Sequence, residues 1–153
     1  MKKIKLLPGL AMLISFCLFV SGCKKDENKN TTMYSISATM TGAQEVPAVT
    51  TNGTGTVTGT YDASTKILTY NVSWNNLSGN ATLAHFHGPA AAGSTASPVV
   101  TFQLTPGVTS VSGTANLTEQ QQSDLLTGLW YANVHTQAHG GGEIRGQVSA
   151  TLQ

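Results

Sequence analysis

Hydrophobic and polar residues alternate with a period of two along several stretches of the chain, which predicts β-strands. The clearest stretches are 56–60, 67–74 and 130–135, which are rich in β-branched and aromatic residues. Further strand candidates lie at 33–40, 81–87, 98–104, 112–117 and 143–152. The polar segment 61–66 separates two of them and predicts a hairpin connection. Strands at this spacing predict an all-β fold, an antiparallel β-sandwich.

One short helix near 118–127 interrupts the strands. Thr118 is a favourable N-cap, and Gln121 three residues later completes the pattern of a capping box. Glu119 suits the positive end of the helix dipole. Gly128 follows the last apolar residues of the segment and predicts its end.

The first 32 residues do not belong to this pattern. Residues 1–22 have a basic start, an apolar run over 10–20 and a small-residue end, the layout of an export signal. The run is too short to span a membrane, which takes about 20 apolar residues. The last residues before Cys23 resemble the cleavage box of bacterial lipoproteins, in which the cysteine is lipidated. We therefore expect a signal peptide over 1–22, the lipidated Cys23 with a flexible tether over 23–32, and one domain over 33–153.

Charge and cysteine content exclude some kinds of function. After residue 32 the chain has two cations, Lys66 and Arg145, against five carboxylates, so it lacks the basic surface that nucleic-acid binding requires. The two cysteines are Cys17, inside the expected signal, and Cys23, so the domain has no thiol or disulfide. No Gly-x-Ser-x-Gly nucleophile motif is present, which leaves no support for a hydrolase.

Three of the predicted strands each place polar side chains on the face opposite to their core residues. Phe86, Trp130 and Ile144 are the predicted core residues that fix the two faces. If the strands are neighbours, their polar side chains converge into one outward-facing patch. The members of this patch are His85, His87, Tyr131, Asn133, His135, Glu143 and Arg145.

Two interpretations of the histidines in this patch remain open. In the first, His85, His87 and His135 are nitrogen ligands of copper or zinc, since a His-x-His pair on a strand spaces two imidazoles for one ion. Glu143 or Asn133 would then accept hydrogen bonds from the remaining ring N–H groups. In the second, the histidines are structural and each forms hydrogen bonds of its own that fasten strands and loops.

Five blocks along the chain resemble the CHRD family, a domain named after chordin and found in exported bacterial proteins. The resemblance covers about 34–151, and its motifs lie at 42–47, 84–89, 117–118, 131–136 and 142–147. The family usually has isoleucine where this chain has Phe86. His85, His87, His135 and Arg145 are also similar in order to residues of copper–zinc superoxide dismutase, without its disulfide. This implies a sandwich of the immunoglobulin-like or superoxide-dismutase-like kind.

The resemblance implies a non-catalytic binding or structural module at the cell envelope, and it gives no reason to expect an enzyme. The alternative is a copper- or zinc-binding protein that uses His85, His87 and His135 and for which redox activity is open. Lipid on Cys23 would place the domain at the outer membrane or cell surface. The membrane is the expected partner, together with a protein or small ligand that the sequence does not identify.

Overall fold

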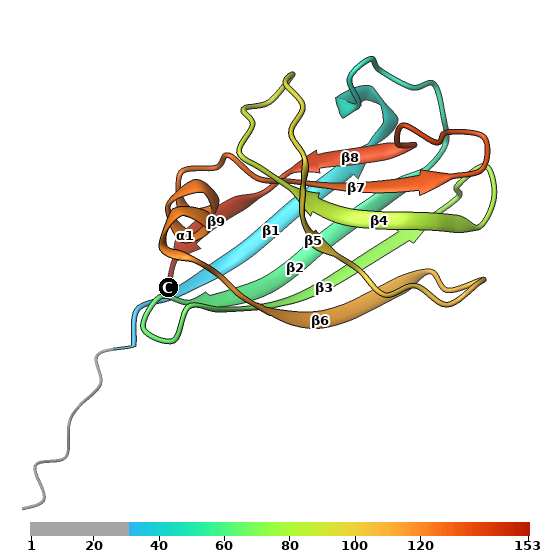
Figure 1. The fold of residues 1–153 in the computed structure, drawn as a ribbon. Coiled ribbons are helices and arrows are strands. Elements are labelled where there is room, and N and C mark those ends of the chain that lie inside the picture. Colours follow the sequence, from blue (N-terminus) through green and yellow to red (C-terminus); the bar gives the residue numbers. More distant parts are fainter. Residues whose placement is uncertain (1–30) are drawn as a thin grey trace, which may run out of the picture.

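The computed structural model describes residues 31–153 and has the predicted all-β architecture with one short helix. Figure 1 shows the arrangement of these elements. The strands are β1 (Met33–Thr41), β2 (Thr54–Asp62), β3 (Ile67–Asn75), β4 (Ala81–His87), β5 (Pro98–Thr101), β6 (Ser110–Asn116), β7 (Tyr131–Thr136), β8 (Ile144–Gln147) and β9 (Ser149–Leu152). The helix α1 spans Glu119–Leu126, and a 3₁₀ turn, η1, spans Gly42–Gln44.

All the strands belong to one antiparallel sheet, which folds over on itself into a nearly closed, sandwich-like body. The hydrogen-bonded order is β5-β4-β7-β8-β1-β2-β3-β6, and β9 pairs with β1. In Figure 1, β4, β7 and β8 lie on one side of the body, with β2, β3 and β6 on the other. Aromatic rings join the two sides, since Tyr70 of β3 meets Phe86 of β4 edge to face at 5.3 Å between centroids. The prediction of an antiparallel sandwich is confirmed.

The alternation in the sequence corresponds to the faces of the strands. In β2 and β3 every second residue is buried in the core, including Val57, Leu68 and Val72. Trp130 lies just before β7 and is fully buried. The intervening residues of β2 and β3 are mostly serine, threonine or asparagine and face solvent. The core therefore sits between the two sides of the folded sheet.

Two predicted strands differ in extent from the observed ones. The segment predicted over 98–104 is a strand only over Pro98–Thr101. The segment predicted over 143–152 divides at Val148, whose backbone N–H donates to the carbonyl of Trp130. Before this point β8 pairs with β7, and after it β9 pairs with β1. The change of partner is a long-range effect that alternation along the chain does not reveal.

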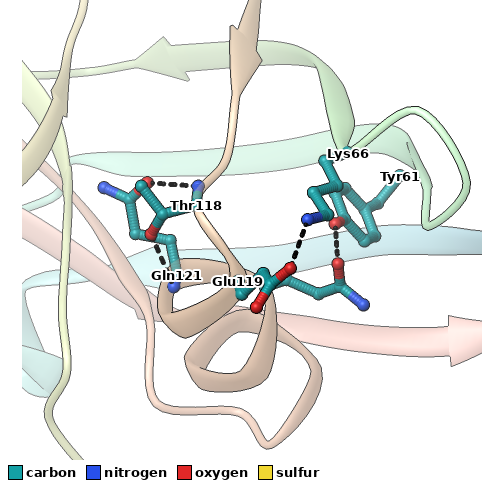
Figure 2. A network of polar contacts seen from close by, with 6 residues as sticks. Tyr61, Lys66, Thr118, Glu119 and Gln121 are labelled. Carbon is teal, nitrogen blue, oxygen red and sulfur yellow. Dashed lines mark hydrogen bonds and ion pairs between the residues drawn. The ribbon is translucent and has the colours of Figure 1, made fainter.

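The helix has the predicted cap. The Thr118 side chain accepts a hydrogen bond from the backbone N–H of Gln121, and the Gln121 side chain accepts one from the N–H of Thr118 (Figure 2). Lys66 in the β2–β3 hairpin forms an exposed ion pair with Glu119 at 2.9 Å. Gly128 has a φ of 75°, the left-handed conformation that ends helices without strain in glycine.

The predicted signal peptide, Cys23 and most of the tether lie outside the described residues. Within 31–153, no helix has the length and hydrophobicity needed to cross a membrane.

Candidate metal centre

Strand β7 brings the predicted polar residues together because it lies between β4 and β8. His87 of β4 is opposite Tyr131, and His85 is opposite Asn133. Arg145 of β8 is opposite Asn133 on the other edge. The three strands are therefore neighbours, which is the condition for their polar side chains to converge.

This polar face is buried, whereas the sequence predicted that it faces outward. All residues of β7 are buried, so neither of its faces is open to solvent. The segment that follows β4 contacts this face through Ala96, and the segment that follows β7 contacts it through Gly140. Loops thus close over the side chains and remove them from water.

One ring nitrogen from each of His85, His87 and His135 lies within 4.8 Å of the others. The ring centroids are 5.3 Å apart for His85 and His87, and 5.2 Å apart for His85 and His135. Nitrogens that bind one ion at about 2.0–2.1 Å lie closer to one another than 4.8 Å. Small rotations of the rings would therefore accompany metal binding. Each imidazole already has a nitrogen close to a nitrogen of both other rings.

The hydrogen bonds of the imidazoles fix which nitrogens remain available. His87 Nδ1 donates to the carbonyl of Ala96, and His135 Nδ1 donates to the carbonyl of Gly140, each at 2.9 Å. Because a carbonyl only accepts, these Nδ1 atoms hold the proton and the Nε2 atoms keep a free lone pair. His87 Nε2, His135 Nε2 and His85 Nδ1 are buried without a partner. Backbone carbonyls, and not Glu143 or Asn133 as predicted, thus accept the Nδ1–H bonds of His87 and His135.

Burial keeps the three imidazoles neutral. Burial, with repulsion from His135 and His87, lowers the pKa of His85 to about 4. Burial also lowers the pKa of His87 and of His135, although their bonds to backbone carbonyls act in the opposite direction. A neutral imidazole is the form that binds a metal ion, so protons compete little with a metal at neutral pH.

The donor set fits a borderline metal ion. Three imidazole nitrogens suit copper or zinc and do not suit calcium or magnesium, which prefer oxygen. No carboxylate or thiol of residues 31–153 joins the cluster of three histidines. A fourth coordination position would therefore be left for water or a small ligand.

A family model for the CHRD domain matches residues 36–148. The chain belongs to the CHRD family. The match includes the three histidines and Arg145. No curated protein and no solved structure matches the chain.

In this CHRD domain Tyr131 separates the histidines from Arg145. The Tyr131 ring stacks on His87 with centroids 4.7 Å apart and an angle of 7° between planes. The guanidinium carbon of Arg145 lies 3.5 Å from the centroid of the same ring. Because His87 and Arg145 come from the strands on either side of β7, they lie on opposite faces of the ring. The Tyr131 hydroxyl is held by the backbone of Ala96 at 3.2 Å.

Glu143, predicted to face outward in the polar patch, is buried and makes its hydrogen bonds away from the histidines. Its fully buried carboxylate accepts hydrogen bonds from the hydroxyls of Thr51, Ser78 and Thr136 and from the backbone N–H of Ser78. Burial acts to raise the pKa of Glu143, but these donors outweigh it and lower the pKa to about 2. Glu143 therefore fastens three segments of the CHRD domain and has no hydrogen bond to a histidine or to Arg145.

Glu45, which lies in the motif at 42–47, also contributes a side chain to this buried polar region. Its carboxyl accepts a hydrogen bond from the amide of Asn133 at 2.7 Å. Burial raises the pKa of Glu45 to about 7, although Arg145 and Asn133 act to lower it. Gly142, with a φ of 130°, leaves room for this pair, since a Cβ there would lie 2.2 Å from the Asn133 amide nitrogen. The sequence did not indicate that Asn133 would be the hydrogen-bond partner of Glu45.

Proposed function

We propose that this protein is a non-catalytic binding module of the cell envelope whose ligand is a copper or zinc ion held by His85, His87 and His135. One observation carries the proposal: His85, His87 and His135 each offer a ring nitrogen within 4.8 Å of the others, and each has a buried ring nitrogen without a hydrogen-bond partner. Leaving a buried polar atom unpaired costs about 1–3 kcal/mol. Metal coordination would supply the missing partner for all three at once.

The structural interpretation of the histidines has less support. Histidines that only fasten loops would use both of their ring nitrogens or expose the unused one to water. Two of the three here fasten loops through Nδ1, but the same bonds also orient the rings and set the tautomer that a metal ligand needs. The loop contacts therefore favour metal binding and do not compete with it.

Equilibrium dialysis tests this function. We expect the purified chain to retain one copper or zinc ion per molecule, while magnesium, which prefers oxygen ligands, is not retained. A chain that retains neither copper nor zinc would contradict the proposal.

We also propose that Cys23 carries the lipid that holds the domain at the outer membrane or cell surface. Cys23→Ala is then expected to abolish lipid labelling and to release the protein from the membrane fraction, since acyl chains contribute about 0.8 kcal/mol per buried methylene. Cys17→Ala is the matched control, because Cys17 lies within the proposed signal peptide and should leave labelling unchanged. A Cys23→Ala chain that stays labelled and membrane-bound would refute the anchor.

A further inference from the structure

Arg145 is a buried cation that forms no salt bridge with any residue of 31–153. Its side chain is only 2 % exposed. Among the described residues its side chain has one hydrogen bond, from Nη2 to Gln147 Oε1 at a long 3.4 Å. Glu45, whose pKa Arg145 acts to lower, lies within electrostatic range but forms no ion pair with it. Because desolvating a charge is costly, buried cations are normally paired with an anion. The guanidinium thus has a carboxylate within electrostatic range but no direct salt bridge.

A cavity lies beside this guanidinium. It has a volume of about 170 Å³ and is lined by polar side chains of Gln44, Glu45, Arg145 and Gln147. Ala43, Val46, Ala92 and Gly93 complete the lining. Ordinary small-molecule pockets have about 300–1,000 Å³, so this cavity suits a group of only a few atoms.

The orientation of Arg145 leaves its donors available to such a group. The guanidinium carbon lies 3.5 Å over the centroid of the Tyr131 ring, so the ring covers one side of the group. The five N–H donors lie in the plane of the guanidinium, and one of them is engaged, by Gln147. A planar fork of donors matches the two oxygens of a carboxylate or phosphate.

We propose that this cavity binds a small oxyanion, a carboxylate or phosphate group, through the in-plane donors of Arg145. The site is separate from the three histidines, because the Tyr131 ring lies between them. Glu45 lines the same cavity without forming an ion pair with Arg145. When ionised, its carboxylate opposes the bound anion.

The chain offers a direct spectroscopic test, because Arg145 is its only arginine. In a chain labelled with ¹⁵N-arginine, a single Nε–H signal reports on this side chain. We expect acetate or phosphate at constant ionic strength to shift that signal along a saturating curve, whereas chloride does not. If acetate alone or phosphate alone saturates the signal, that result identifies which of the two oxyanions the site takes. A signal that neither anion shifts more than chloride does overturns the proposal.

Three variants make the test specific to the cavity. Arg145→Gln is expected to weaken anion binding, followed by anion-dependent melting, by at least about tenfold, since it removes hydrogen bonds from a charged group. Glu45→Gln should tighten binding at pH 8, because it removes a competing negative charge while keeping an oxygen for Asn133. Lys66→Gln, which removes the other cation of the domain, should change nothing. If Arg145→Gln does not fold, the arginine signal in the Glu45→Gln chain decides: unchanged or weaker binding there contradicts the proposed site.

Discussion

Replacing Trp130 with alanine is expected to lower the free energy of unfolding by about 3–5 kcal/mol. The indole ring is 0 % exposed and contacts Phe86, with ring centroids 5.8 Å apart. The backbone of Gly88 packs directly on it, because a Cβ at Gly88 would lie 2.6 Å from the indole. Removing the ring leaves a large cavity that this close-packed surrounding cannot fill. Since the free energy of unfolding of a domain is about 5–15 kcal/mol in total, this loss removes a large part of it.

Leu83→Ala is the matched control for this prediction. Leu83 is also a large apolar strand residue, but its side chain is 51 % exposed. Its replacement should change stability by no more than about 0.5 kcal/mol. Urea unfolding of the two variants measures the difference. Losses of similar size would contradict the placement of Trp130 at the centre of the core.

The elements of the fold were predictable where burial follows a short period along the chain. In β2 and β3 one face is buried and the other meets water, so alternation alone identifies the strands. The capping box at Thr118 was equally accessible, because both of its partners lie within four residues. Interactions between residues that are close along the chain determine these features, so a single sequence is enough to predict them.

The surroundings of the histidines were not predictable, because distant segments create them. Alternation correctly separated His135 from Val134, but it could not reveal that loops cover the polar face as well. The partners of His87 and His135 are carbonyls of Ala96 and Gly140, and a backbone carbonyl has no signature in the sequence. Glu143 was misplaced for the same reason, since its donors Thr51 and Ser78 are far from it along the chain.

The central claim is that His85, His87 and His135 together hold one metal ion. An ion that binds only the folded chain stabilises it by about 2.7 kcal/mol at a free concentration 100 times the Kd. This corresponds to a rise of several degrees in Tm for a domain of this size. The His85→Ala, His87→Ala double variant retains one ligand of three and should show no rise. His139→Ala is the control, because His139 is not a member of the cluster.

Thermal unfolding of these chains with and without copper(II) or zinc is the most direct test. The expected result is a rise in Tm for the wild-type chain and the His139→Ala variant, with no change for the double variant. The Tm of each variant without metal shows that it folds, and His135→Ala alone serves if the double variant does not. A wild-type chain that is indifferent to both ions, or a double variant that responds as strongly as wild type, would contradict the account.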